Sequence, residues 1–269
     1  MNKKFLMIII GVIAVVGIFI VLGGRKVNLA HPSIVRSLLD QARQLEAKGD
    51  LFEAKLLYQK LVNDFPESSE VTRWQKKAED MNMKLLFSST VTPKSILYEI
   101  RPGDTLNKIA REHKTTVELI KKSNNISDAF IIVGRKIKVW NAPFNILIDK
   151  SQNTLLLKTD EEVVKTYIIS TGKNNCTPVG TFKIDIKQVN PTWFKAGAIV
   201  PPESSENVLG TRWMGFDRTG AGAGYGIHGT TEPKELGKQV TQGCVRLSNA
   251  DVEELYSIIP VGTEVTIIQ

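Results

Sequence analysis

Two short segments of the sequence carry the residue types that thiol chemistry requires. One holds His228 followed by Gly229, and the other holds Cys244 preceded by Gly243. A free thiol has a pKa of about 8.5 and is mostly protonated at neutral pH, so a nucleophilic cysteine needs a base. His228 is the only histidine after residue 113. We therefore expect Cys244 to act as a nucleophile and His228 to take its proton.

An acyl-transferring thiol also needs backbone N–H groups directed at the developing oxyanion. Gly243 lets the backbone approach a substrate closely, and we expect the amides around Gly243 and Cys244 to form this oxyanion hole. A cysteine and a histidine alone are a weak indication, because a lone cysteine is usually a small buried hydrophobe. The choice between the two interpretations therefore depends on the neighbouring residues.

Those neighbours resemble the catalytic domain of the L,D-transpeptidases of the YkuD type. The family signature is a histidine followed, further along the chain, by Ser/Thr-x-Gly-Cys-hydrophobic-Arg/Asn. Thr241-Gln-Gly-Cys-Val-Arg246 fits this signature, and Ser170-Thr-Gly-Lys173 with Thr177-Pro-Val-Gly-Thr-Phe182 resembles another landmark of the family. Gln242 stands where many members have histidine, a position that varies in the family. The resemblance covers residues 144–269 and implies a mainly-β catalytic domain.

The resemblance implies a two-step acyl transfer between peptidoglycan stem peptides. Cys244 would attack an L,D amide bond of a donor tetrapeptide, and the amine of a neighbouring stem would resolve the thioester into a 3→3 cross-link. His228 would move the proton, with the Gly229 carbonyl orienting its imidazole. If water resolved the thioester, the enzyme would be an L,D-carboxypeptidase. If a protein lysine did, it would attach proteins to the wall. The residues leave these alternatives open.

Further site residues follow from the same resemblance. Arg246 would either hold a substrate carboxylate or brace its loop, while Tyr225 and Trp213 would line the donor groove. Aromatic residues in a β domain are more often part of the core. Carbapenems are expected to acylate the thiol. No cofactor is expected, and the absence of HExxH and CxxC motifs argues against a metal site.

A second resemblance covers residues 96–140. Alternating and helical spacings predict strand, helix, helix and strand there. The pattern Tyr98-x-Ile-x-x-Gly-Asp-Thr-Leu106, then Asn124, then Gly134-x-x-Ile-x-Val139, resembles a LysM domain. That family binds glycans containing N-acetylglucosamine, such as peptidoglycan. The glycan-binding residues implied by the resemblance are Gly103, Asp104, Thr105 and Asn124. Two alternatives are a module that has lost glycan binding, and a whole chain that is only a non-catalytic wall tether.

The remaining segments predict how the enzyme is held. Residues 5–24 carry no charge and are flanked by basic residues, and about 20 apolar residues suffice for a membrane span. We expect residues 1–26 to be a single-pass anchor with an extracytoplasmic catalytic domain, because a cleaved signal peptide has a shorter apolar core of about 7–15 residues. Residues 32–87 resemble one tetratricopeptide repeat. Since a single repeat buries its face poorly, we expect a helical spacer.

The predicted architecture is therefore multi-domain: a transmembrane helix, a short α-helical spacer, a small βααβ LysM domain and a mainly-β catalytic domain. The net charge of +7 can favour nucleic acid, anionic lipid or an acidic polymer such as a bacterial wall, so the charge alone does not choose a partner. No nucleic-acid-binding motif occurs, and we expect peptidoglycan and the membrane as partners, not nucleic acid.

Overall fold

The computed structural model describes residues 32–127, 130–195, 197–217 and 220–269. Contacts divide the chain into two compact units, residues 1–78 and 79–269. No helix in the described part is long and apolar enough to cross a membrane. The expected anchor at residues 1–26 lies outside the described residues.

The predicted helical spacer consists of three helices. They are α2 (Pro32–Lys48), α3 (Leu51–Asp64) and α4 (Val71–Leu86). Asp50 caps α3, since its carboxylate accepts a hydrogen bond from the Glu53 backbone N–H. Buried Ala42, Ala54 and Leu61 form the apolar interior of the first unit. The last residues of α4 belong to the second unit.

The segment with the LysM pattern has the predicted order of strand, two helices and strand. Its elements are β1 (Ser95–Glu99), α5 (Leu106–Glu112), α6 (Val117–Ser123) and β2 (Lys136–Trp140). The strands β1 and β2 pair antiparallel. A small core of Ile100, Ile109, Ile120, Ile137 and Val139 lies between the strands and the helices.

The catalytic region is mainly β, as predicted. Among the described residues, eight of its strands form one sheet in the order β13-β11-β10-β7-β14-β3-β4-β5. These strands are β3 (Asn145–Asp149), β4 (Thr154–Thr159), β5 (Glu162–Ile168), β7 (Gly180–Val189), β10 (Arg212–Phe216), β11 (Gly226–His228), β13 (Val245–Arg246) and β14 (Glu264–Ile268). One helix, α7 (Asn249–Ile258), is capped by the Ser248 hydroxyl, which accepts from the Asp251 N–H.

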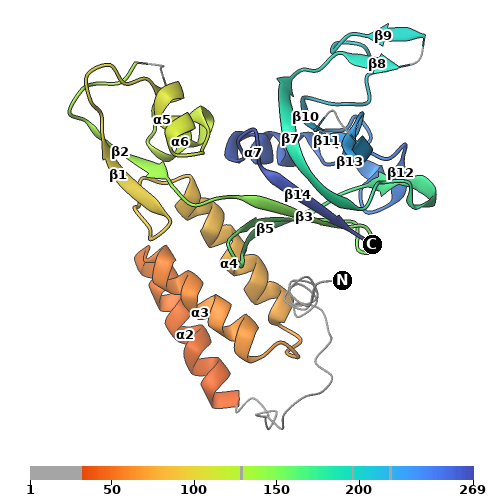
Figure 1. The fold of residues 1–269 in the computed structure, drawn as a ribbon. Helices are drawn as coiled ribbons and strands as arrows, with labels where there is room; N and C mark the ends of the chain where they lie inside the picture. Colours follow the sequence, from red (N-terminus) through yellow and green to blue (C-terminus); the bar gives the residue numbers. More distant parts are fainter. Residues whose placement is uncertain (1–31, 128–129, 196, 218–219) are drawn as a thin grey trace. The chain divides into compact units, whose positions relative to one another are not determined.

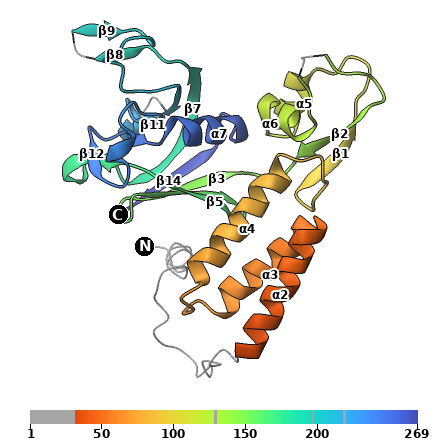
Figure 2. The same ribbon diagram turned by 180° about the vertical axis from the view of Figure 1, so that it is seen from behind.

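Short elements surround the sheet. Strands β6 (Thr171–Gly172) and β12 (Gln239–Thr241) pair parallel, and β8 (Trp193–Lys195) and β9 (Ala198–Val200) form a hairpin. Single turns of 3-10 helix occur at η1 (Lys173–Asn175), η2 (Gly220–Gly222) and η3 (Pro233–Glu235). Figures 1 and 2 show that the β8–β9 hairpin projects from the rest of the catalytic region.

The LysM segment and the catalytic region share one hydrophobic core within the second unit. Leu119 of α6 and Trp140 of β2 belong to the same cluster as Leu255 of α7. The Thr116 hydroxyl donates to the Ser257 carbonyl at the end of α7, and α6 lies beside α7 in both ribbon views (Figures 1 and 2). The two regions therefore pack against each other. The LysM motif lies on the elements from β1 to β2, and the catalytic motif lies around β11 and β13.

Candidate active site

The sheet brings the predicted nucleophile and base to neighbouring strands. Cys244 directly precedes β13, and His228 is the last residue of β11, which pairs with β13 in parallel. The register places His228 opposite Arg246, so His228 lies two positions beyond Cys244 along the neighbouring strand. Because side chains alternate between faces along a strand, Cys244 and His228 lie on the same face. The parallel pairing of β11 with β13 therefore brings the two predicted residues to one face of the sheet.

His228 is fixed in one tautomer. Its Nδ1 lies 2.6 Å from the Gly229 carbonyl oxygen, which can only accept, so Nδ1 carries the proton and Nε2 is left as the acceptor. The ring stacks on the Trp213 indole with 5.7 Å between centroids. Burial lowers the imidazole pKa to about 4; Arg246 lowers it further, and the Gly229 and Leu209 carbonyls oppose the shift. The imidazole is therefore neutral at physiological pH.

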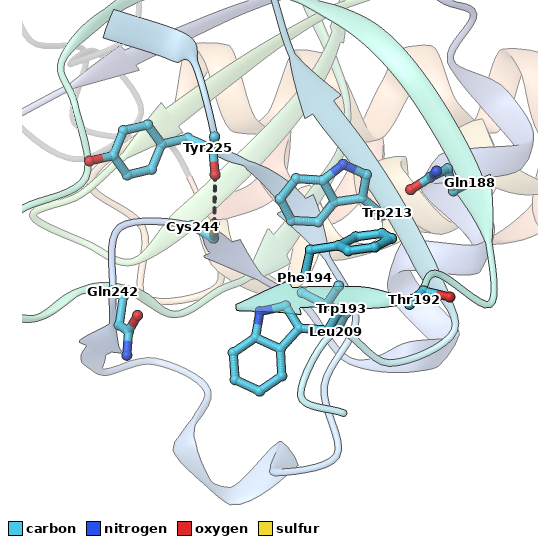
Figure 3. Close-up of a pocket in the computed structure, with 10 residues that line it drawn as sticks. Gln188, Thr192, Trp193, Phe194, Leu209, Trp213, Tyr225, Gln242 and Cys244 are labelled. Carbon is cyan, nitrogen blue, oxygen red and sulfur yellow. Dashed lines mark hydrogen bonds between the residues drawn. The ribbon is translucent and has the colours of Figure 1, made fainter. Parts of the chain in front are cut away.

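The Cys244 thiol is also uncharged at rest. Burial raises its pKa to about 11, while the Gly226 N–H and Arg246 lower it and Cys176 raises it. Its Sγ lies 3.9 Å from the Gly224 carbonyl oxygen, the dashed contact in Figure 3. A thiol pKa far above the imidazole pKa disfavours a preformed ion pair. The proton is therefore expected to move to His228 only as the thiol attacks.

Gly243 shapes the loop that carries Cys244. Its φ of +121° lies where L side chains are strained, and a Cβ on this residue would stand 2.4 Å from the Tyr225 ring. Its N–H donates to the Thr241 hydroxyl, which in turn donates to the Cys244 carbonyl. Sequence reasoning placed the Gly243 amide in the oxyanion hole, but this amide already has an acceptor. The Cys244 N–H is the better candidate.

A groove of about 350 Å³ opens beside Cys244. It is lined by Gln188, Thr192, Trp193, Phe194, Leu209, Trp213, Gly224, Tyr225, Gln242 and Cys244. Figure 3 shows Cys244 between Tyr225 and Trp213, the two aromatic residues predicted for the donor groove. The Trp213 indole fits because Gly215 and Gly226 lie beneath it, where a Cβ would come within 2.8 Å and 2.9 Å of its atoms.

Arg246 lies away from the lining of this groove. It is 8% exposed, and its Nη1 donates to Glu232 at 3.0 Å and to Glu235 at 2.9 Å. Neither glutamate was singled out in the sequence, because no motif marks them. Of the two roles expected for Arg246, these ion pairs favour bracing of the loop.

The residues predicted to bind glycan form hydrogen bonds inside the LysM segment. The Asp104 carboxylate accepts from Tyr98 and from the Arg101 N–H, and the Thr105 hydroxyl caps α5. The Asn124 side chain donates to the Ile120 and Lys138 carbonyls and accepts from the Lys138 N–H. Gly103 adopts a φ of +81° in the turn before α5. Their predicted role in glycan binding remains a prediction.

Asn249 is a site residue that sequence reasoning missed. Its side-chain oxygen accepts from the Thr211 and Thr230 N–H groups at 3.2 Å each. It therefore joins the segment before Trp213 to the segment after His228. A Cβ on Gly229 would stand 2.2 Å from this oxygen, so the glycine is needed here for close packing. In the sequence, Asn249 is marked only by its position one residue after Ser248, the cap of α7.

Comparisons with known proteins agree with this site. Residues 143–267 match the family model of the L,D-transpeptidase catalytic domain (YkuD), and residues 98–140 match the LysM domain. The putative L,D-transpeptidase YkuD of Bacillus subtilis (strain 168) is 34% identical over 179 residues, which are 64% of this chain and 98% of the relative. The putative L,D-transpeptidase YqjB of the same strain is 40% identical over 124 residues, 45% of this chain and 69% of the relative.

A solved L,D-transpeptidase from Mycobacterium smegmatis is 21% identical, with a TM-score of 0.39, over 52% of this chain and 65% of that chain. The relative YkuD of B. subtilis is matched over 98% of its length at 34% identity. The chain therefore belongs to the L,D-transpeptidase family. The predicted LysM and YkuD-type domains are thus confirmed, whereas the tetratricopeptide-like spacer and the membrane anchor remain predictions.

Proposed function

We propose that this protein is a peptidoglycan L,D-transpeptidase that forms 3→3 cross-links through a thioester on Cys244. One observation carries the proposal. The cysteine of the family motif lines an aromatic groove and directly precedes β13, the strand paired with that of a neutral histidine whose Nε2 is left as a proton acceptor. Family membership supplies the substrate class, and the site supplies the groups that acyl transfer needs.

The first half-reaction forms the thioester. The Cys244 thiol gives its proton to Nε2 of His228 while Sγ attacks the donor carbonyl carbon. The Cys244 N–H is placed to donate to the resulting oxyanion. When the tetrahedral intermediate collapses, the C–N bond breaks and Nε2 returns the proton to the leaving amine of the terminal D-residue. The Gly229 carbonyl stabilises the transient imidazolium through Nδ1.

The second half-reaction reverses these roles. The acceptor amine attacks the thioester carbon and gives a proton to Nε2, and the thiolate leaves and recovers that proton. A neutral resting pair suits this cycle, because burial leaves little thiolate free to react with adventitious electrophiles. The groove beside Trp213 and Tyr225 is the proposed donor site.

The other segments are proposed to hold the enzyme at its substrate. The LysM domain would bind glycan strands, and the uncharged residues 5–24 would anchor the chain in the membrane with residues 32–87 as a spacer. The catalytic region would then work outside the cytoplasm. Retention of the full chain in membrane pellets after alkaline washing, and its release when residues 1–26 are removed, would test the anchor.

The activity itself is tested with the full-length protein in detergent and purified disaccharide-tetrapeptides, with products analysed by mass spectrometry. A cross-linked dimer lacking one terminal D-residue supports transpeptidation. A disaccharide-tripeptide alone would mean that water resolves the thioester and that the enzyme is a carboxypeptidase. No product from either route, with Cys244 still reactive, would contradict the proposed substrate.

A further inference from the structure

Arg246 is held by two carboxylates from the loop that connects the base to the nucleophile. Glu232 directly precedes the η3 turn and Glu235 is its last residue, between His228 and Cys244 in the chain. Both accept from the same guanidinium nitrogen, at 3.0 Å and 2.9 Å. The arginine side chain is only 9% exposed, whereas those of the glutamates are 54% and 39% exposed. Two partly exposed carboxylates of this loop thus pair with the buried guanidinium of Arg246.

The backbone ties the same cluster to both reacting residues. The N–H and carbonyl of Arg246 pair with the carbonyl and N–H of Ser170 at 2.9 Å and 2.8 Å. The Ser170 hydroxyl also donates to the Glu235 carbonyl. On the other side, the Leu247 N–H donates to the His228 carbonyl at 2.8 Å. A shift of Arg246 would therefore displace Cys244 and the strand of His228 together.

We propose that Arg246, Glu232 and Glu235 form a clamp, named here the Arg246 clamp, that positions Cys244 and His228 for proton transfer. Arg246 is then a positioning residue and not the ligand of a substrate carboxylate. This inference rests on the proposed function, because it concerns the same thiol and base. The two glutamates gain a role that no motif assigns to them.

Charge balance supports this choice over carboxylate binding. One guanidinium already faces two carboxylates, so the cluster has a net negative charge and would repel a third carboxylate at close range. Arg246 is also absent from the residues that line the groove beside Cys244. The arginine charge nevertheless reaches both reacting groups: secondary to burial, it lowers the pKa of His228 and the pKa of Cys244.

The test uses the full-length protein, with the variants Arg246→Lys, Arg246→Met and the double variant Glu232→Gln/Glu235→Gln. Lys234→Gln is the control, since Lys234 is exposed in the same loop and outside the clamp. Steady-state kcat and KM are measured with a disaccharide-tetrapeptide donor. The alkylation of Cys244 by iodoacetamide, which has no carboxylate, is followed across pH by peptide mass spectrometry, so that exposed Cys176 is counted separately.

The clamp predicts that kcat falls about tenfold in Arg246→Lys and in the double glutamine variant while KM stays within about twofold. Both carboxylates bond to one nitrogen, Nη1, and the shorter lysine side chain does not carry its ammonium out to the position of that nitrogen. Arg246→Met should also move the pH profile of Cys244 alkylation to higher pH, because the positive charge near the thiol is lost. Arg246→Lys keeps that charge, so its alkylation profile should match the wild type although its kcat is lower. Lys234→Gln should match the wild type.

Other results would overturn the clamp. A higher KM at unchanged kcat in Arg246→Lys would make Arg246 a carboxylate ligand, as would a lower KM in the double glutamine variant. Unchanged kcat in Arg246→Lys and in the double glutamine variant would mean that the three residues stabilise the loop without positioning Cys244 and His228. If Arg246→Met does not fold, the double variant still decides, because the side chains it changes are partly exposed. If the donor is not turned over at all, the proposed function fails while the alkylation profiles still test the clamp.

Discussion

In the LysM segment, the motif side chains form hydrogen bonds that hold the elements of the segment itself together. Asp104 accepts from Tyr98, six residues away, and Asn124 ties the end of α6 to β2. In the catalytic region, the motif side chains contact the loops around the two reacting groups. The Cys244 Sγ lies near the carbonyl of Gly224, 20 residues earlier in the chain, and Arg246 pairs with Glu232 and Glu235 on the loop that follows His228.

The difference shows what each motif is for. The LysM motif encodes a small fold that can be recognised from a short stretch of sequence, and its side chains are occupied in holding that fold. The catalytic motif leaves its reactive groups unbonded to each other in the described residues, and the surrounding strands hold them in place. Substitutions should therefore separate: those of the reacting side chains Cys244 and His228 should remove activity with little loss of stability, and those in the LysM motif should do the reverse.

The largest effect is expected for Cys244→Ala. Turnover should disappear while the thermal unfolding midpoint stays close to the wild-type value, because a small half-buried side chain is replaced by a smaller one. Treatment with a carbapenem should add a single acyl group to the wild type and none to this variant, as seen by intact mass. Cys176→Ser is the control and should keep both activity and adduct. An adduct that maps to Cys176 would overturn the assignment of the nucleophile.

The next effect concerns His228. Replacement by alanine should slow acylation by about 10²- to 10⁴-fold, the usual contribution of a positioned base. The base works when neutral, and its pKa is lowered to about 4 by burial. Acylation by a carbapenem should therefore persist as the pH falls through 6.5 and decline only as it approaches about 4. A decline centred near 6.5 would mean that the imidazole is solvated when it reacts.

A smaller effect is expected for Gly243→Ala, which probes the loop geometry. The new methyl group meets the Tyr225 ring, and the φ of +121° adds backbone strain of about 1–3 kcal/mol. Activity should fall by more than this loss of stability explains, because Cys244 moves with the loop. Gly237→Ala is the matched control: its φ of +84° is also strained, but its nearest atom is 3.8 Å away. Equal loss of activity in both variants would contradict the role of the Tyr225 contact.

The smallest effect on chemistry is expected for Asn124→Ala. It removes the bonds to Ile120 and Lys138 and should destabilise the protein by about 1–3 kcal/mol, the cost of leaving buried partners unpaired. The rate of thioester formation on a small soluble donor should stay near the wild-type value at a temperature where the variant is folded. The exposed Asn107→Ala serves as control in denaturant unfolding. A loss of rate without a loss of stability would mean that the LysM segment acts on the catalytic site.

The sequence by itself determined the elements whose signals are local. The caps at Thr105 and Ser248 precede α5 and α7, and the spacing of apolar residues in 96–140 predicted the strands β1 and β2. The two motifs also identified both families, since each is contained in a short stretch of chain. Capping and periodicity depend on residues only a few positions apart, so they can be read without knowing the fold.

Only the tertiary structure decided which distant groups meet. The pairing of β11 with β13 sets His228 beside Cys244, and the bridge from Ser170 brings Arg246 to Glu235. Asn249 reaches loops that lie 19 and 38 residues earlier in the chain. An ion pair or a buried amide has no periodicity in sequence, and its partner is fixed by strand order and register. For that reason the nucleophile could be named from the sequence, while the residues that hold it in place could not.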